Sequence, residues 1–141
     1  MENRKRLWYP KPQDVLNNNK KVLDIFCASK RDKHEVRNLS KLDPVIREAK
    51  KTKGDVETKA AVLMRGINKA HSFSSANKRT AYFTANEFVC KNKGYWIAKK
   101  RDRQRDMCVK IRESRVTDKE VADWLKYAHK NKVYGEDRWD S

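Results

Sequence analysis

The stretch from His71 to Thr80, HSFSSANKRT, constrains the fold more than any other part of the chain. Apolar residues recur at helical spacing on both sides of it, which predicts one helix that ends beside His71 and a second that begins at Asn77. They are Val56, Ala60, Leu63, Ile67 and Ala70 before the stretch, and Ala81, Ala85, Phe88 and Val89 after it. The second helix should end at Gly94 with a left-handed C-cap. The sequence therefore predicts a helix, a tight loop and a helix N-terminus.

This arrangement suits phosphate chemistry. The first amides of a helix are unsatisfied donors at the positive end of its dipole, and Lys78 and Arg79 bring two cations to them. His71 can act as a general base toward a hydroxyl near neutral pH. Taken singly, His71 is better explained as a histidine at a helix C-terminus, and Asn77 as an ordinary N-cap. Together they indicate transfer of a phosphate-containing group to a hydroxyl.

The stretch resembles the signature of the Fic/Doc family, His-x-Phe-x-(Asp/Glu)-(Gly/Ala)-Asn-(Gly/Lys)-Arg, and its second half looks like the Doc branch. Six identities fall within nine positions: His71, Phe73, Ala76, Asn77, Lys78 and Arg79. Two further segments also resemble Doc-like chains. The segment from Leu42 to Ile46 looks like the Asp-Pro helix start that precedes their core, and the segment from Val116 to Leu125 looks like their closing helix. In outline the resemblance covers roughly residues 10 to 130.

The resemblance implies a role for most of these residues. In Fic/Doc proteins the histidine takes the proton of a target Ser, Thr or Tyr hydroxyl, and this role falls to His71. The anion hole corresponds to the amides near Ala76 and Asn77, and Arg79 would hold nucleotide phosphates. Phe73 would be a structural part of the motif.

Two departures from adenylyl-transferring Fic proteins imply the group that is transferred. Lys78 stands where those proteins have Gly, and Tyr82 stands where they usually have a second Arg. Both features resemble Doc, in which the gamma-phosphoryl group of ATP faces the histidine. Lys78 and Arg79 would then bind the phosphates and stabilise the charge that develops on the transferred group.

Ser75 is the most serious departure from the family pattern. It occupies the position of the acidic residue that holds the magnesium ion of the nucleotide. A neutral hydroxyl is a poor substitute, because Mg²⁺ prefers charged oxygen ligands. Ser75 would then contact the phosphates and anchor Mg²⁺ weakly, or turnover is slow, or the protein only binds its ligand. Glu87 lies about two and a half turns along the second helix, too far to replace the acid.

The chain is strongly basic, with 35 Lys and Arg against 19 Asp and Glu and a net charge of +16. Runs such as the one from Lys99 to Arg105 could bind nucleic acid or an acidic partner. A solvated basic surface explains them equally well, because no DNA- or RNA-binding signature accompanies them. The chain also lacks the (Ser/Thr)-x-x-x-Glu-(Gly/Asn) pattern of self-inhibited Fic proteins. This resembles the Doc arrangement, which implies a separate antitoxin, and an acidic one would suit this charge.

The expected fold is all-α, a single Fic/Doc-like domain over residues 1–141 with about six helices and possibly a short hairpin. The segments 1–9 and 131–141 would be peripheral. Further expected elements are a first helix after Pro12 with Val15, Val22 and Phe26, a charged loop from Ser29 to Glu35, a helix from Asp43 to Ala49 and an extended segment from Tyr95 to Ile97. A helix around Met107, Cys108 and Ile111 should follow, then a last helix that Thr117 and Glu120 begin as a capping box and that carries Val121, Trp124, Leu125 and Ala128 on one face. Asp55 should cap the helix that leads to His71.

Several function classes are excluded or left open. No apolar run approaches membrane length and no signal-peptide core follows the basic N-terminus, so we expect a cytoplasmic chain with no membrane partner. The three cysteines, Cys27, Cys90 and Cys108, are far apart and fit reduced thiols better than zinc or disulfides. We expect His34 to be a solvated residue in the charged loop, and His129 to lie near the end of the last helix.

Two readings from different classes remain. The first is a Doc-like toxin that phosphorylates a Ser or Thr hydroxyl of a translation factor, with elongation factor Tu or its equivalent as the candidate implied by the resemblance. The second is a catalytically weak or inactive Fic-fold protein that binds nucleotide, nucleic acid or a protein partner. A protein adenylyltransferase is a further alternative.

Overall fold

The computed structural model describes residues 6–25, 35–127 and 129–131. These residues form six α-helices, one 3-10 helix and two short strands, so the all-α prediction is confirmed. In chain order the elements are α1 (Pro12–Ile25), η1 (Leu39–Lys41), α2 (Leu42–Lys51), α3 (Val56–Ala70), α4 (Asn77–Lys93), β1 (Trp96–Ala98), α5 (Arg101–Arg112), α6 (Asp118–Lys126) and β2 (His129–Asn131). No described helix has the length and apolar content needed to span a membrane.

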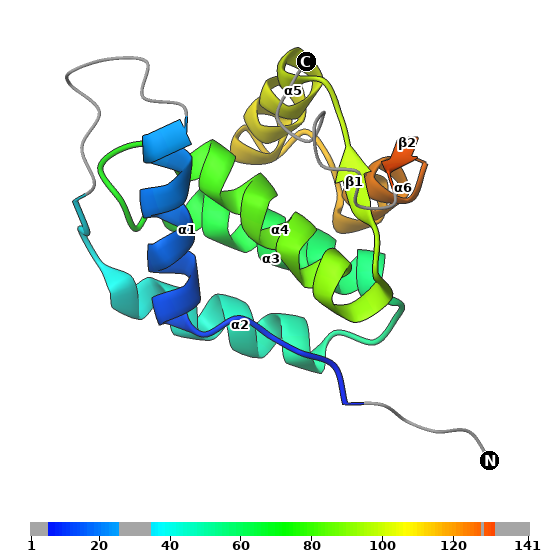
Figure 1. The fold of residues 1–141 in the computed structure, drawn as a ribbon, viewed down its shortest axis with the longest axis horizontal. Helices are drawn as coiled ribbons and strands as arrows, with labels where there is room; N and C mark the ends of the chain where they lie inside the picture. Colours follow the sequence, from blue (N-terminus) through cyan, green and yellow to red (C-terminus); the bar gives the residue numbers. More distant parts are fainter. Residues whose placement is uncertain (1–5, 26–34, 128, 132–141) are drawn as a thin grey trace.

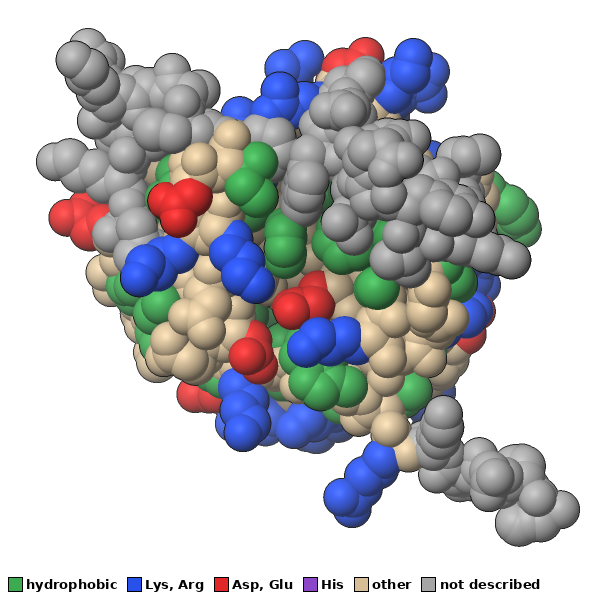
Figure 2. Space-filling view, viewed as in Figure 1, with side chains coloured by type: hydrophobic (Ala, Val, Ile, Leu, Met, Phe, Trp, Pro, Cys, Tyr) green, Lys and Arg blue, Asp and Glu red, His purple; other side chains and the backbone are tan. Residues whose placement is uncertain are grey.

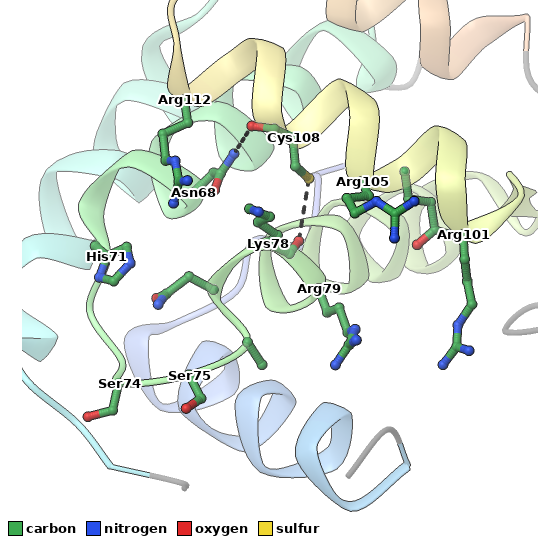
Figure 3. Close-up of a pocket in the computed structure, with 13 residues that line it drawn as sticks. Asn68, His71, Ser74, Ser75, Lys78, Arg79, Arg101, Arg105, Cys108 and Arg112 are labelled. Atoms are coloured by element: carbon green, nitrogen blue, oxygen red, sulfur yellow. Dashed lines mark hydrogen bonds between the residues drawn. The ribbon is translucent and has the colours of Figure 1, made fainter. Parts of the chain in front are cut away.

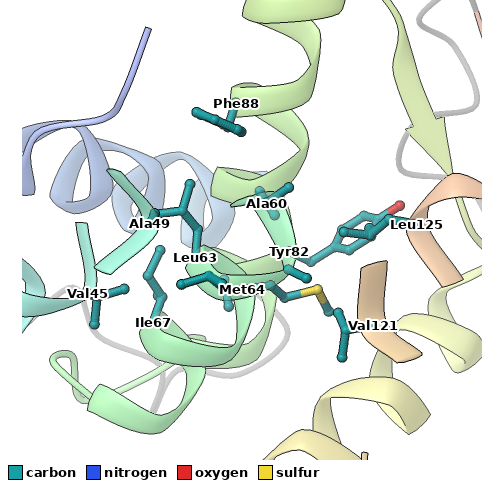
Figure 4. Close-up of a cluster of buried hydrophobic side chains, with 14 of the residues drawn as sticks. Val45, Ala49, Ala60, Leu63, Met64, Ile67, Tyr82, Phe88, Val121 and Leu125 are labelled. Carbon is teal, nitrogen blue, oxygen red and sulfur yellow. The ribbon is translucent and has the colours of Figure 1, made fainter. Parts of the chain in front are cut away.

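Helices α3 and α4 form the centre of the molecule, and the other helices pack around them (Figure 1). Most of α3 is buried, which explains why it carries so many small and aliphatic residues. Helix α2 approaches it closely at Gly66, where a Cβ atom would lie only 2.4 Å from Val45 Cγ1. Figure 4 shows this side of the core, in which Val45 and Ala49 of α2 face Leu63 and Ile67 of α3.

Helix α4 is held by buried polar contacts as well as by apolar packing. Asn86 Nδ2 donates to Ile97 O (2.7 Å) and Asn86 Oδ1 accepts from Ile97 N (2.8 Å), so β1 is fastened to α4. On another side, Asn18 and Asn19 of α1 donate to the hydroxyl groups of Thr84 and Thr80 (3.0 and 3.1 Å). These pairs satisfy polar groups that would be costly to bury alone.

The predicted helix boundaries are confirmed where a capping residue marks them. Asp55 caps α3 by accepting from Thr58 N, and Thr117 and Glu120 form the expected capping box of α6. Gly94 ends α4 in the left-handed conformation, with φ of 82°. The extended segment is also present, as β1, and its Trp96 and Ile97 are buried.

The C-terminal end of α6 differs from the prediction. The helix ends at Lys126, and His129 belongs to strand β2 rather than to a helix. The difference arises from a contact between segments that are distant in the sequence. Strand β2 pairs antiparallel with β1, with Ile97 opposite Lys130, so the backbone of β2 forms hydrogen bonds with β1 instead of continuing the helix. The two strands are also no hairpin, because α5 and α6 separate them. Cys27, Phe26, Ala128 and the residues 29–34 of the expected loop, His34 included, lie outside the described residues.

On one face of the molecule the basic side chains lie in more than one place (Figure 2). On the face shown in Figure 2 they gather at the upper edge, over α5, and along the lower edge, over α2, with acidic side chains between them. Helix α5 is rich in arginine, and one of its faces is turned toward the His71–Thr80 stretch.

Candidate active site

The loop between α3 and α4 turns sharply at both of its ends. His71 ends α3 with φ of 51° and Ala76 precedes α4 with φ of 64°, so both are left-handed. Residues other than glycine adopt this conformation infrequently, and histidine is among those that tolerate it better. The His71 side chain is exposed at the mouth of the loop, whereas Ser72 and Phe73 are buried beneath it.

Asn77 fixes the shape of this loop. Its Nδ2 donates to Phe73 O (2.8 Å), and its Oδ1 accepts from Phe73 N (3.1 Å). Asn77 is thus the first residue of α4 and not its N-cap, a position that Ala76 takes. Because Thr80 N is bonded to Ala76 O (2.9 Å), the N–H groups of the preceding turn lie at the open end of the helix.

Neighbouring segments hold the loop from two further sides. Asn19 of α1 donates to Ser75 O (2.9 Å). The chain after residue 34 pairs with it across an isolated bridge between Val36 and Phe73, and Ser74 N donates to Glu35 O (2.9 Å). Phe73 is fully buried in the core, so its side chain supports the loop from below and does not face the site. The loop backbone is therefore well fixed before any ligand binds.

Above the loop lies a pocket of about 450 Å³, a size typical of small-molecule sites (Figure 3). It brings together the predicted site residues His71, Ser75, Ala76, Asn77, Lys78 and Arg79. Asn68 and Ser74 also line it, and helix α5 supplies the opposite wall with Arg101, Gln104, Arg105, Cys108 and Arg112.

The wall formed by α5 was not predicted as part of the site. The sequence predicts a basic surface for the run from Lys99 to Arg105 and gives no role to Arg112. The available signal was periodic: Arg101, Arg105, Cys108 and Arg112 follow at intervals of four, three and four residues, which places them on one face of a helix. The same spacing also fits a solvated basic face, so it does not by itself identify a site.

Two contacts of Cys108 hold α5 against the rest of the pocket. Asn68 Nδ2 of α3 donates to Cys108 O (2.9 Å), and Cys108 Sγ lies 3.6 Å from Lys78 O of α4. Burial raises the pKa of the Cys108 thiol to about 12, although the Lys78 charge opposes the shift, so the thiol stays neutral near pH 7. A neutral thiol can donate the weak hydrogen bond to Lys78 O.

The pocket is cationic. Five of its lining residues are Lys or Arg: Lys78, Arg79, Arg101, Arg105 and Arg112. Within the described ranges no Asp or Glu lines it, and no group of three or more residues of the metal-binding types is found. The carboxylate of Glu35 lies beside the loop, where its Oε1 accepts a hydrogen bond from the Ser74 hydroxyl (2.7 Å), and it does not line the pocket. This donor set fits a phosphate-bearing ligand and does not fit a magnesium ion held by a protein carboxylate.

Comparison with known protein families gives a match to the Fic/DOC family over residues 9–89, which is more than half of the chain. The matched range contains α1 to α3, the loop and most of α4. It ends before α5, so the arginine-bearing wall lies beyond it. A search of curated proteins gave no match. The extent of the family match, together with the helix, loop and helix around His71, shows that the chain belongs to the Fic/DOC family.

Proposed function

We propose that this protein is a Doc-like phosphotransferase, which moves the gamma-phosphoryl group of ATP to a Ser or Thr hydroxyl of a protein. The observation that carries the proposal is the pocket in which the His71 imidazole, the open end of α4 and the cations Lys78 and Arg79 share one space. A base, an anion-binding helix end and two charges are the parts that such a transfer requires.

The reaction needs few groups. The target hydroxyl oxygen attacks the gamma phosphorus and forms a new P–O bond, while the bond from that phosphorus to the bridging oxygen breaks and ADP leaves. His71 takes the hydroxyl proton. Lys78 and Arg79 stabilise the charge on the phosphoryl oxygens and on the leaving diphosphate.

Tyr82 favours phosphoryl over adenylyl transfer. This residue occupies the position of the second arginine of adenylyl-transferring Fic proteins, and its side chain is buried. Its hydroxyl donates to Ile97 O (2.9 Å), and burial raises its pKa, so it stays neutral. Tyr82 is therefore committed to the core and leaves Lys78 and Arg79 as the cations of α4 at the pocket.

The resemblance to Doc suggests the setting. The target would be a component of the translation machinery in the cytoplasm, with elongation factor Tu or its equivalent as the first candidate. A separate antitoxin with an acidic segment would complement the charge of +16. Nucleic acid is a further partner to test through the basic surface.

A second reading rests on one observation. The described part of the chain brings no carboxylate into the pocket, and this favours, as the alternative, a weakly active or inactive Fic-fold protein that binds nucleotide, nucleic acid or a protein partner. ATP labelled at the gamma or the alpha position separates the readings when it is incubated with the protein, a cell extract and purified elongation factor Tu. Gamma label on a protein supports the proposal, alpha label assigns adenylyl transfer, and no label with retained ATP binding assigns the second reading.

A further inference from the structure

Helix α5 gives the pocket a charge that the loop and α4 alone would not have. Arg105 and Arg112 lie on the face of α5 that lines the pocket, and Cys108 lies between them on the same face (Figure 3). Met107 and Ile111 bury the adjacent side of the helix in the core. Since Cys108 is bonded to α3 and lies against α4, the helix cannot turn its arginines away without losing these contacts.

These two arginines differ from others in the protein. Arg65 pairs with Glu48 and Asp118, and Arg115 pairs with Glu113. Across residues 6–25, 35–127 and 129–131, no such carboxylate pair is found for Arg105 or Arg112. Two guanidinium groups thus face a cavity that also holds Lys78 and contains no described acid. An anion that enters this space would relieve the repulsion among these like charges, so the pocket favours an anionic ligand.

We propose that the pocket binds the metal-free form of a nucleoside triphosphate, with Arg105 and Arg112 neutralising charge that a magnesium ion would otherwise neutralise. The proposal rests on the proposed function only in taking the pocket as a nucleotide site. A fully ionised triphosphate carries more negative charge than its magnesium complex, so a cationic pocket favours the free form. A magnesium ion would enter among like charges, with the Ser75 hydroxyl in place of a carboxylate. Guanidinium groups bind phosphate oxygens in a bidentate manner, which makes them suitable replacements.

Calorimetric titration of the full chain with ATP, in EDTA and separately in excess Mg²⁺, tests the proposal. We expect ATP to bind in EDTA at least as tightly as in Mg²⁺. Arg105→Gln and Arg112→Gln should each weaken binding about tenfold, the effect of losing one charge-assisted hydrogen bond. Arg105→Lys, which keeps the charge but not the fork of donors, should lose less than Arg105→Gln.

Arg103→Gln is the matched control. Arg103 is exposed on the same helix, does not line the pocket, and its loss lowers the net charge by the same amount. It should change ATP affinity by less than about twofold. Thermal unfolding of each variant shows whether a lost signal comes from the pocket or from the fold. If Arg105→Gln unfolds, the ATP affinities of Arg105→Lys and Arg103→Gln are compared instead. A larger loss of affinity in Arg105→Lys supports the proposal, and equal losses contradict it.

Three results would overturn the inference. They are ATP binding only in Mg²⁺, equal losses in Arg103→Gln and Arg105→Gln, and Arg105-dependent binding of single-stranded RNA without any binding of ATP. The titration contains no target protein, so it is independent of the proposed reaction. Metal-free ATP binding without label transfer keeps this inference and removes the proposed reaction, whereas label transfer with strictly magnesium-dependent binding does the reverse.

Discussion

Asn68 and Cys108 are joined by a buried hydrogen bond in which Asn68 Nδ2 donates to Cys108 O over 2.9 Å. Asn68 lies three residues before His71, and Cys108 lies between the pocket-facing arginines of α5. The bond therefore fixes the position of the candidate base relative to the cationic wall. If α5 moved away, the buried Asn68 amide would lose its hydrogen-bond partner at a cost in free energy. A movement of α5 is therefore opposed by α3, the helix that ends at His71.

The first prediction concerns His71. His71→Ala should lower the rate of gamma-phosphoryl transfer by about 100-fold or more, because a positioned base contributes that much to proton removal. ATP affinity should change little, since in the proposed complex the arginines and Lys78 would make the phosphate contacts. Initial rates with gamma-labelled ATP measure the first effect and calorimetry the second. The variant should also relieve growth inhibition on expression, and a variant as active as the parent would show that another group is the base.

The second prediction concerns Ser75. Ser75→Asp should make ATP binding tighter in Mg²⁺ than in EDTA, because it restores a charged oxygen ligand at the position that the family uses for the metal. Ser75→Asn is the matched control, since it has a similar size to Asp and no charge. Titrations with and without Mg²⁺ measure the difference. An equal response in both variants would mean that the metal, if bound, is held elsewhere.

The third prediction concerns the contact of α2 with α3. Gly66→Ala should destabilise the protein by about 1–2 kcal/mol, because a Cβ atom would lie 2.4 Å from Val45 Cγ1. The gain of about 1 kcal/mol in helix propensity is smaller than the cost of overpacking a stiff, β-branched side chain. Chemical denaturation measures the change.

A double-mutant cycle gives the control for this contact. In a Val45→Ala background the same Gly66→Ala change should be neutral or stabilising, since the clash is gone and the propensity gain remains. A Gly66→Ala variant more stable than the parent would show that the helices separate at little cost.

The fourth prediction concerns pH and Asp55. Burial opposes ionisation of this carboxyl, but hydrogen bonds from Lys126 and Thr58 outweigh burial and lower its pKa from 3.8 to about 2. A lowered pKa stabilises the fold above pH 4, and this contribution is lost as the pH falls from about 4 to 2. Asp55→Ala should cost about 1 kcal/mol at pH 7 through the lost cap.

The difference in stability between the parent and Asp55→Ala should therefore shrink over that acidic range. Asp43→Asn serves as the control, because Asp43 is an exposed acid in the first turn of α2 and its loss removes the same charge. Unfolding curves at several pH values measure both. A difference that stays constant down to pH 2 would contradict the role given to the ionised carboxylate.

The sequence was most informative where a local signal marked an element. Helix α3 is present over the predicted residues because Asp55 caps it and its apolar residues keep one period up to His71. The capping box of Thr117 likewise fixed the start of α6, and the order of residues in the stretch from His71 to Thr80 predicted the loop. Each of these signals operates within a few residues along the chain.

Features that depend on distant partners were not predictable in the same way. Strand β2 carries no alternating apolar pattern and exists because it pairs with β1. The side chain of Asn77 turns back and forms hydrogen bonds with the backbone of Phe73. An asparagine at the start of a helix also fits an ordinary N-cap, so the sequence alone does not distinguish the two arrangements. The pocket face of α5 became evident only through the contacts of Cys108 with Asn68 and Lys78.

The attachment of β1 to α4 through Asn86 has a consequence for α5. Strand β1 ends at Ala98 and α5 begins at Arg101, so only Lys99 and Lys100 connect them. A connector of this length limits where α5 can start, and the contacts of Cys108 with Asn68 and Lys78 select the rotation that turns Arg105 and Arg112 toward the pocket. An inserted residue that extended into the helix would shift each of these side chains by about 100° around the helix axis, given the helical turn of 3.6 residues. The short connector and the Cys108 contacts therefore act together to set which side of α5 lines the pocket.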